Sequence, residues 1–108
     1  MWLHGDLHPA NLLVSHGELS AVLDFGLLGL GDPACDLMVA WTYLPPVARG
    51  VFRRTLDVDD ATWCRARGWA LNLGLRAAAW AGSNSVLTAI GRNTVAAVVA
   101  DAAAGRLR

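Results

Sequence analysis

Hydrophobic positions near the start of the chain form short runs that alternate with polar or glycine-containing segments. Residues 12–15 and 21–23 are β-type runs, and residues 16–18 (His-Gly-Glu) between them have the composition of a turn. The pattern predicts a β-hairpin in which Val14 pairs with Ala21.

The open end of the predicted hairpin carries two polar side chains. The same register sets Leu12 opposite Leu23 and Asn11 opposite Asp24. Directly opposed residues of an antiparallel pair lie about 5 Å apart. We therefore expect one amide and one carboxylate to meet there, as a shared metal ion requires.

From residue 32 onwards the apolar spacing becomes helical. Asp32 can cap a helix and Pro33 suits its first turn. A helix is therefore predicted from there to residue 43, before Pro45 and Pro46 stop it. Three further helices are predicted over residues 47–56, 61–81 and 85–104, with caps for the second of them offered by Asp57, Asp59 and Asp60.

The long helix predicted over residues 61–81 is apolar on more than one side. Helices that are apolar all round lie buried between others, so we expect a layered helical subdomain. The predicted fold class is α+β and mostly helical: a single domain, with the hairpin in residues 1–31 and the helical subdomain in residues 32–108. The apolar positions of the long helix are Trp63, Trp69, Ala70, Leu73, Ala77 and Trp80 on one broad face, with Leu71, Leu75 and Ala78 beside it.

The composition limits the class of protein. The chain has 108 residues, of which 55% are hydrophobic and 17% charged, so it is expected to fold as one domain rather than remain disordered. Its formal net charge is zero, which argues against a nucleic-acid partner or an anionic membrane surface. All 9 cationic residues are arginines, and the sequence contains no lysine.

The cysteines and the chain start bear on location. Cys35 and Cys64 lack metal-site or redox spacing and lie in apolar, helix-like contexts, so both are predicted to be reduced core residues of a cytoplasmic protein. No basic segment followed by an apolar run opens the chain, and no signal peptide is predicted. Residues 95–104 are apolar but interrupted by Asp101 and too short to cross a bilayer. A soluble protein is expected.

Two short clusters carry the candidate chemistry. The first is His-Gly-Asp-Leu-His-Pro-Ala-Asn at residues 4–11, and the second is Asp-Phe-Gly at residues 24–26. This pattern is typical of the catalytic and metal-binding loops of kinase-type phosphotransferases. Phosphoryl transfer needs a carboxylate near the acceptor hydroxyl and oxygen ligands for metal ions on the phosphates.

Each acidic or amide residue here has a structural interpretation beside the functional one. Asp6 is predicted to take the proton of the acceptor hydroxyl; alternatively, it stabilises a turn. Asn11 and Asp24 are predicted magnesium ligands, with a strand-edge turn residue and a strand-end cap as the alternatives. Asp36 either interacts with the dipole of its helix or reaches back to hold the backbone of the first cluster.

The histidines are predicted to support the loop. His4 is expected to be architectural, packing near the metal loop and holding loop backbone. His8 either approaches the phosphate or acceptor or bonds the loop backbone, and the second role is favoured. The spacing of His4, Asp6 and His8 also fits a metallohydrolase, but zinc needs further His or Cys ligands. Only His16 remains, at the far end of the hairpin, so a zinc site is not expected.

Three motifs together resemble one family. They are His-Gly-Asp-Leu-His-Pro-Ala-Asn-Leu-Leu at residues 4–13, Val-Leu-Asp-Phe-Gly at residues 22–26 and Gly-Asp-Pro-Ala-Cys-Asp-Leu at residues 31–37. In this form they resemble the aminoglycoside phosphotransferase family of protein-kinase-like small-molecule kinases. The resemblance is tight over residues 3–41 and looser beyond, and the third motif separates this family from ordinary protein kinases.

The resemblance implies a kinase-like C-terminal lobe that uses Mg²⁺ and ATP or GTP. Such an enzyme transfers the γ-phosphate to a hydroxyl of a small molecule. The acceptor is either a metabolite or an aminoglycoside-like antibiotic, and in the second case the enzyme would confer resistance to that antibiotic. Residues that bind the nucleotide are not identified in this chain. Carried over to this sequence, the resemblance assigns the base to Asp6, the magnesium ligands to Asn11 and Asp24, and support of the catalytic loop to His4, His8 and Asp36.

The chain departs from that family in one large respect. Family members place an N-terminal lobe, with a lysine on the phosphates, before the catalytic loop, whereas this sequence opens just before that loop and has no lysine. The expectation is a C-terminal lobe without its ATP-binding lobe. Alone it would be weakly active or inactive, and it would need a separate N-lobe chain or a longer product.

Two other interpretations stay open. The chain could be a truncated, non-catalytic remnant that acts as an interaction module, with an exposed apolar surface that binds a partner or drives self-association. A relative of the choline or sugar kinases would share the mechanism and differ only in the acceptor.

Overall fold

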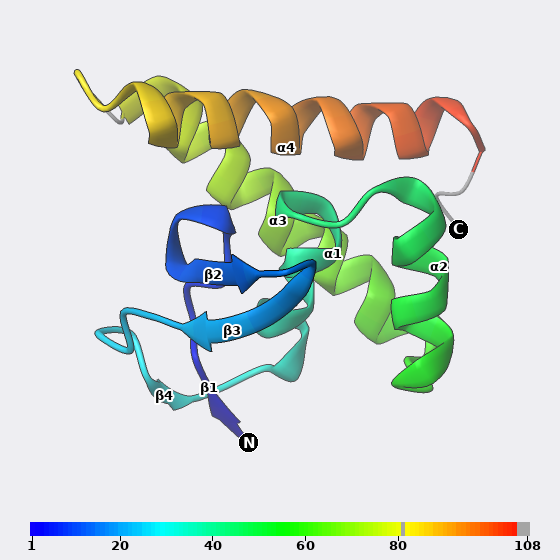
Figure 1. Cartoon of the computed structure of the whole chain (residues 1–108). Helices are drawn as coiled ribbons and strands as arrows, with labels where there is room; N and C mark the ends of the chain where they lie inside the picture. The colour runs from blue at the N-terminus through cyan, green and yellow to red at the C-terminus, as the bar shows by residue number, and fades with distance from the viewer. Residues whose placement is uncertain (81, 106–108) are drawn as a thin grey trace.

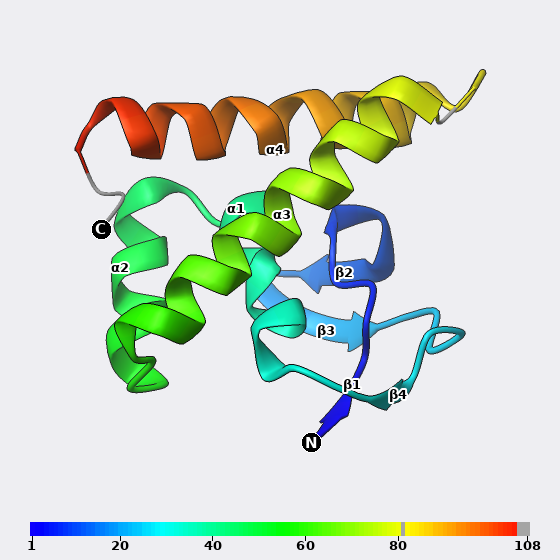
Figure 2. The same ribbon diagram turned by 180° about the vertical axis from the view of Figure 1, so that it is seen from behind.

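The structure is a computed structural model that describes residues 1–80 and 82–105. The small strands lie on one side of a helical part (Figures 1 and 2). In this part α4 runs along one edge, and α3 crosses α4. This arrangement confirms the α+β, mostly helical class. The elements are β1 (Trp2–Leu3), the 3₁₀-helix η1 (Pro9–Asn11), β2 (Leu12–Ser15), β3 (Glu18–Val22), β4 (Gly29–Leu30), the 3₁₀-helix η2 (Pro33–Met38), α1 (Val39–Thr42), α2 (Pro46–Thr55), α3 (Asp60–Trp80) and α4 (Ser85–Ala103).

Strands β2 and β3 pair as the predicted antiparallel hairpin, but the predicted register is wrong. Leu13, rather than Val14, lies opposite Ala21. The register then shifts between Leu13 and Val14, and Val14 lies opposite Leu19. Such an irregularity leaves unpaired backbone in one strand and bends it.

The turn of the hairpin explains why β3 is longer than predicted. His16 and Gly17 have φ angles of 53° and 78°, and the flanking residues Ser15 and Glu18 are paired. Two consecutive positive φ angles are typical of the two-residue turns whose twist matches that of antiparallel strands. Glu18 therefore starts the strand, although its polarity is typical of a turn.

Strands β1 and β4 form a second antiparallel pair, which the sequence pattern did not predict. Trp2 lies opposite Leu30, and Leu3 lies opposite Gly29. Strands of two residues show no measurable alternation, so periodicity cannot reveal them. The pairing holds the segment that follows the Asp-Phe-Gly cluster beside the start of the chain.

The first helical segment begins at its predicted cap. The Asp32 side chain accepts a hydrogen bond from the Ala34 N–H at 3.0 Å, but Pro33–Met38 is a 3₁₀-helix and only Val39–Thr42 is α-helical. Arg65 of α3 donates to both Asp32 carboxylate oxygens, at 2.8 and 3.3 Å. These bonds, with that from the Ala34 N–H, hold the pKa of Asp32 below its usual range.

The remaining helices start within one residue of their predicted positions. Asp59 accepts from the Thr62 N–H at 2.7 Å at the start of α3, which lowers the pKa of Asp59. Asn84 caps α4 by accepting from the Leu87 N–H at 3.1 Å. The predicted end of the long helix, residue 81, lies outside the described residues.

The hydrophobic core forms where η2 and α1 pack against α3 and α4. Trp41 and Trp63 are its largest members, with ring centroids 4.7 Å apart. Helices α3 and α4 cross closely at Gly74 and Gly91: a Cβ atom on Gly91 would lie 2.7 Å from the Gly74 carbonyl oxygen. Small residues at the crossing allow the two helix backbones to approach.

Helix α3 is buried along one side, so the prediction that it lies buried between other helices on every side is wrong. Trp63 and Ala70 are buried, whereas Trp69, Leu75 and Trp80 are 41%, 53% and 86% exposed. Helix α4, η2 and α1 supply the main contacts to α3. Apolar periodicity identifies the faces available for packing but not which of them a neighbour covers.

The two cysteines differ in environment. Cys35 is buried, as predicted, and burial raises the pKa of its thiol. Cys64 is exposed on α3, so its predicted placement in the core is wrong. Both thiols are free.

Within the part of the chain that the structure describes, α4 alone is long and apolar enough to cross a membrane, judged by length and composition. Residues 95–103 of the predicted apolar stretch belong to this helix, which runs for 19 residues. Core helices of soluble proteins satisfy the same criterion, and α4 packs along α3.

Candidate functional site

Residues 4–8 of the first cluster form an irregular loop between β1 and η1, and its last three residues form η1. Gly5 has a φ of 89°, and a Cβ atom there would lie 2.8 Å from the Leu27 carbonyl oxygen. Glycine therefore serves both the left-handed backbone and the close approach of the segment that contains Leu27. The two sequence clusters are thereby placed against each other.

Two side chains from the following helices fix the loop backbone. The Asp36 carboxylate accepts from the His4 and Gly5 N–H groups, each at 2.9 Å. The Thr42 hydroxyl donates to the Leu7 carbonyl oxygen at 3.1 Å. Of the two roles weighed for Asp36, the geometry favours the one that braces the loop. The contact from Thr42 had no signal in the sequence.

The buried His4 ring joins the two clusters. Its Nδ1 accepts from the Asp6 N–H at 3.1 Å, which leaves Nε2 to donate to the Leu23 carbonyl oxygen at 2.8 Å. The ring also packs edge-on against Phe25, with centroids 4.7 Å apart. This placement fits the architectural role predicted for His4. With both ring nitrogens engaged, it gives no support to the zinc alternative.

The Asp6 carboxylate is held by two neighbours. His8 Nδ1 accepts from the Ala10 N–H at 3.3 Å, and His8 Nε2 lies 3.3 Å from Asp6 Oδ1 and 3.4 Å from the Asn11 amide nitrogen. The Asn11 side-chain amide donates to Asp6 Oδ2 at 3.2 Å and to the Asp6 carbonyl oxygen at 2.8 Å. The Asn11 amide therefore orients one carboxylate oxygen of Asp6, and the His8 ring lies beside the other.

The amide contacts of Asn11 also determine which of its atoms is available to a cation. Because its nitrogen donates to Asp6, its carbonyl oxygen remains as the ligand atom. Oxygen is the ligand that magnesium prefers, and magnesium commonly takes only one or two protein ligands. In residues 1–80 and 82–105, no group of three or more His, Cys, Asp and Glu side chains could hold a metal ion.

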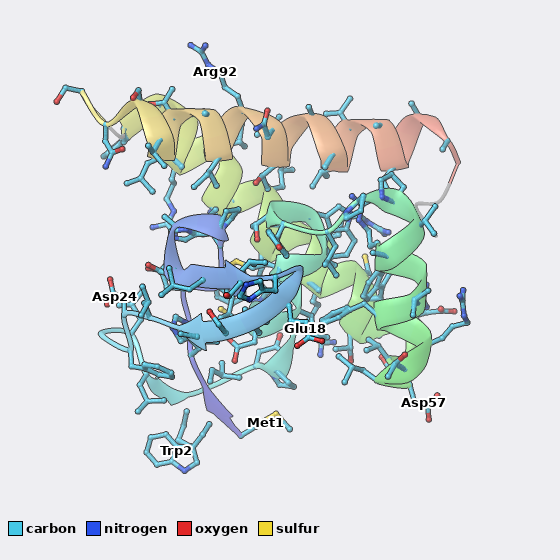
Figure 3. All side chains as sticks on the ribbon, viewed as in Figure 1. Met1, Trp2, Glu18, Asp24, Asp57 and Arg92 are labelled. Carbon is cyan, nitrogen blue, oxygen red and sulfur yellow. The ribbon has the colours of Figure 1, made fainter. Side chains whose placement is uncertain are left out.

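Asp24 follows β3 rather than pairing with Asn11, so the predicted opposition of these two residues is wrong. Instead, the backbone carbonyl oxygen of Asn11 accepts a hydrogen bond from the Leu23 N–H at 2.7 Å. Asp24 has a φ of 57°, and its side chain accepts from the Gly26 N–H at 3.1 Å. It lies at the outer edge of the molecule (Figure 3).

A single open cavity of about 360 Å³ nevertheless brings the candidate residues together. Asp6, Asn11 and Asp24 line it, and so does His8. The turn after Asp24, rather than the hairpin register, carries that carboxylate to the cavity. We call this space the loop cavity. Its full lining is Asp6, His8, Ala10, Asn11, Asp24, Asn84, Val86 and Leu87.

The start of α4 forms the other wall of the loop cavity, which the sequence did not predict. Asn84, Val86 and Leu87 contribute to it. The Asn84 side chain accepts from the Leu87 N–H, so this wall is the capped first turn of a helix. In the sequence, Asn84 could be recognised only as part of a helix break. Nothing near it in the sequence indicated a contact with the first cluster, which lies more than seventy residues before it.

Comparison with known families defines the class of protein as a phosphotransferase. A family model described as the phosphotransferase enzyme family matches residues 1–70, which is more than half of the chain. The chain belongs to this family. The match includes the three motifs from which the resemblance was drawn. Neither the curated proteins nor the solved structures contain a match to the chain.

Proposed function

We propose that the loop cavity is the phosphoryl-transfer site of a small-molecule kinase. In this proposal the γ-phosphate of ATP or GTP passes to a hydroxyl group of a small molecule, an aminoglycoside-like antibiotic or a metabolite. The observation that supports it is that Asp6, Asn11 and Asp24 line one cavity, with the Asp6 carboxylate held by a hydrogen bond from the Asn11 amide and 3.3 Å from the His8 ring.

In the proposed reaction Asp6 acts as the base. The acceptor oxygen forms a bond to the γ-phosphorus, the bond from that phosphorus to the β,γ-bridging oxygen breaks, and the hydroxyl proton passes to the Asp6 carboxylate. Asn11 and Asp24 would hold Mg²⁺, which would neutralise charge on the phosphates. His8 and the Asn11 amide keep the base in position, and Asp36 keeps the loop in position.

The nucleotide requires more than this chain provides. Kinases anchor the phosphates with a lysine, and the sequence has none. Arginine replaces it poorly because its planar fork differs from a compact ammonium group. We therefore propose that residues 1–108 form a C-terminal catalytic lobe of a cytoplasmic enzyme. Alone it would be weakly active or inactive, and it would depend on a nucleotide-binding lobe from a separate chain or a longer product.

A second candidate function is an interaction module, and one surface favours it. Phe25, Leu27, Leu28 and Leu30 are 53%, 64%, 54% and 71% exposed, and Trp2, paired with Leu30, is 69% exposed. We call these five residues the apolar edge. Contiguous exposed apolar surface typically marks a binding face. The same surface suits a missing lobe, another partner or a second copy of this chain.

Magnesium-dependent nucleotide binding separates the two functions. We expect Mg²⁺ with ATP or GTP to raise the Tm of the chain and Asp24→Asn to remove this effect. A nucleotide at about ten times its dissociation constant contributes about 1.4 kcal/mol, or roughly 5–10 °C for a domain of this size. The substitution should preserve the backbone, because asparagine tolerates a positive φ well.

Glu18→Gln is the matched control, because Glu18 is an exposed acid at the distal end of the hairpin (Figure 3). It should retain the full shift, and so should Asp6→Asn, since Asp6 is proposed as base rather than ligand. A shift that is unchanged in Asp24→Asn would contradict the kinase proposal and favour the interaction module.

A further inference from the structure

Helix α4 and the segment that connects α1 to α2 line a cavity of about 700 Å³, which shares no lining residue with the loop cavity. We propose that it binds an uncharged small molecule that contains an apolar ring and a hydrogen-bonding group. We call it the proline cavity, because Pro9, Pro45 and Pro46 contribute to its lining. The proposal does not depend on the function proposed for the loop cavity.

Small side chains on α4 create the space of the proline cavity. Ala96, Ala97 and Ala100 contribute to its lining, and so does Asn93. Residues spaced by three and four positions lie on one face of a helix, so these four form a single shallow face of α4. Larger side chains at the same positions would fill the gap between α4 and the connection from α1 to α2.

The connection between α1 and α2 has a shape that is fixed without a ligand. Pro45 has a φ of −70°, which its ring locks. The Tyr43 and Leu44 N–H groups both donate to the Val39 carbonyl oxygen, at 3.0 and 3.3 Å, and Arg49 donates to the Leu44 carbonyl oxygen at 3.3 Å. A wall that is ordered before a ligand arrives loses little entropy on binding.

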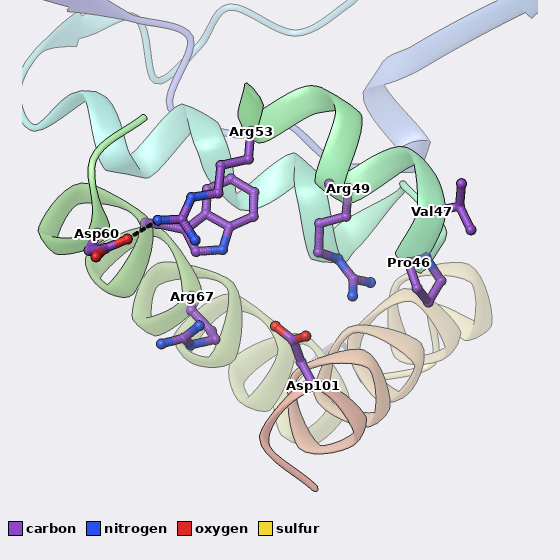
Figure 4. Close-up of a pocket in the computed structure, with 9 residues that line it drawn as sticks. Pro46, Val47, Arg49, Arg53, Asp60, Arg67 and Asp101 are labelled. Carbon is purple, nitrogen blue, oxygen red and sulfur yellow. Dashed lines mark hydrogen bonds and ion pairs between the residues drawn. The ribbon is translucent and has the colours of Figure 1, made fainter. Parts of the chain in front are cut away.

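The charged groups of the lining favour an uncharged ligand. Arg49 and Asp101 are of opposite sign, and both are engaged within the protein: Arg49 donates to the Ala40 carbonyl oxygen at 2.7 Å, and Asp101 accepts from the Trp41 indole N–H at 3.2 Å. In a neighbouring cavity that they also line, their side chains point towards each other (Figure 4). A charged ligand would therefore lose water without gaining an available partner of opposite charge.

The rest of the lining suits an apolar ring with a polar substituent. Trp41 is 3% exposed and Tyr43 is 45% exposed, and both line the cavity beside the prolines. The Tyr43 hydroxyl and the Asn93 amide can each form a hydrogen bond with a ligand. Small-molecule sites typically measure about 300–1,000 Å³ and combine a mainly apolar lining with a few polar groups, and the proline cavity has both properties.

The proline cavity also adjoins the first cluster. Thr42, which is 6% exposed, lines it and donates through its hydroxyl to the Leu7 carbonyl oxygen at 3.1 Å. Pro9 lines it as well, whereas the residues on either side of Pro9, His8 and Ala10, line the loop cavity. A ligand would therefore touch residues that hold the first cluster, and its binding should be visible at the backbone amides of Leu7 and His8.

The test is a ¹H–¹⁵N NMR titration of the whole chain with three probes that share one ring system and differ in charge. They are 1-naphthalenemethanol, 1-naphthoate and 1-naphthylmethylammonium, with NaCl holding the ionic strength constant. We expect saturable shifts of the Tyr43 and Asn93 backbone signals with the neutral probe. The two charged probes should bind at least about ten-fold more weakly, because neither finds an available counter-charge.

Matched variants localise the binding. Ala96→Phe should weaken binding of the neutral probe at least about ten-fold, because its phenyl ring would occupy space that the naphthalene ring needs. Ala89→Phe should leave binding unchanged, because Ala89 is exposed on the same helix but lies outside the lining. If Ala96→Phe does not fold, Ala100→Phe replaces it, since Ala100 is an exposed residue of the lining.

Three results would overturn the proposal. They are shifts that never saturate with the neutral probe, equal affinities for the three probes, and equal losses in Ala89→Phe and in the variants of the proline cavity. None of them bears on nucleotide binding at the loop cavity, so the two proposals can fail separately.

Discussion

Asp36 acts on residues that lie more than thirty positions before it in the sequence. Both of its carboxylate oxygens accept backbone hydrogen bonds, from His4 and Gly5. The loop at residues 4–8 contains Gly5 in the left-handed conformation, and no regular strand pairing stabilises this loop. The position of Asp6 therefore depends on a side chain of another element.

We predict that Asp36→Asn destabilises the chain. An asparagine side chain keeps one acceptor oxygen but turns a donor towards the other N–H group, which then loses its partner. An unsatisfied, partly buried donor costs about 1–3 kcal/mol. Urea denaturation followed by circular dichroism would measure the change in the free energy of unfolding.

Asp57→Asn serves as the control for this substitution. Asp57 is exposed between α2 and α3 (Figure 3), and surface changes of this kind stay within about 0.5 kcal/mol. Equal stabilities of Asp36→Asn and the wild-type chain would show that the loop does not need this brace.

At the scale of secondary structure, local chemical signals predicted the helices well. The Asp32 cap, the Pro45–Pro46 pair at the start of α2 and the Asn84 break each act on adjacent backbone, and the helices start there. The hairpin was predicted to exist, but its register was not, because it depends on the positive φ of His16 and on an irregularity at Val14. Neither has a strong signal in a single sequence.

The candidate site shows the same division. The motif placed Asp6, Asn11 and Asp24 near one another, and they line one cavity. Asp24 comes to line the cavity in a different way from the predicted one, because a left-handed turn at Asp24 replaces its cross-strand pairing with Asn11. The wall that begins at Asn84 could not be predicted, because it results from the packing of distant segments. The exposure of α3 was misjudged for the same reason.

The close crossing of α3 and α4 predicts that adding a single methyl group at Gly91 destabilises the chain. A Cβ atom on Gly91 would lie 2.4 Å from the Ala78 nitrogen and 2.7 Å from the Gly74 carbonyl oxygen. Backbone atoms of a packed helix cannot move aside at little cost. We expect Gly91→Ala to destabilise by about 1–3 kcal/mol, the usual range for overpacking, in urea denaturation.

Gly68→Ala provides the control on the same helix pair. A Cβ atom on Gly68 would meet nothing within 4 Å, so the substitution should instead stabilise α3 by about 0.5–1 kcal/mol through its helix propensity. A Gly91→Ala chain as stable as the wild type would mean that the helices are not packed as closely as described.

For the whole molecule, the surfaces differ in character. The apolar edge lies with β1, β4 and the loop between β3 and β4, on the side of the molecule away from α4 (Figure 1). Leu28 and Leu30 are 54% and 71% exposed there. Such a surface is costly to leave in water and favours association.

We expect the isolated chain to self-associate through the apolar edge. Leu28→Ser together with Leu30→Ser should shift sedimentation velocity profiles at tens of micromolar protein towards the monomer, while Val47→Ser should not. Val47 is 83% exposed but lies on α2, outside the apolar edge. A wild-type chain that stays monomeric, or an equal response to Val47→Ser, would show that the apolar edge does not drive association.

Helix α4 touches a cavity near each of its ends. Its first turn lines the loop cavity, and Asp101 near its other end lines a cavity of about 540 Å³ between α2, α3 and α4. The 19 residues of α4, at about 1.5 Å each, span about 28 Å. The close crossing with α3 at Gly91 lies between these two ends of α4. A tilt of α4 about that crossing would therefore move the walls of both cavities together.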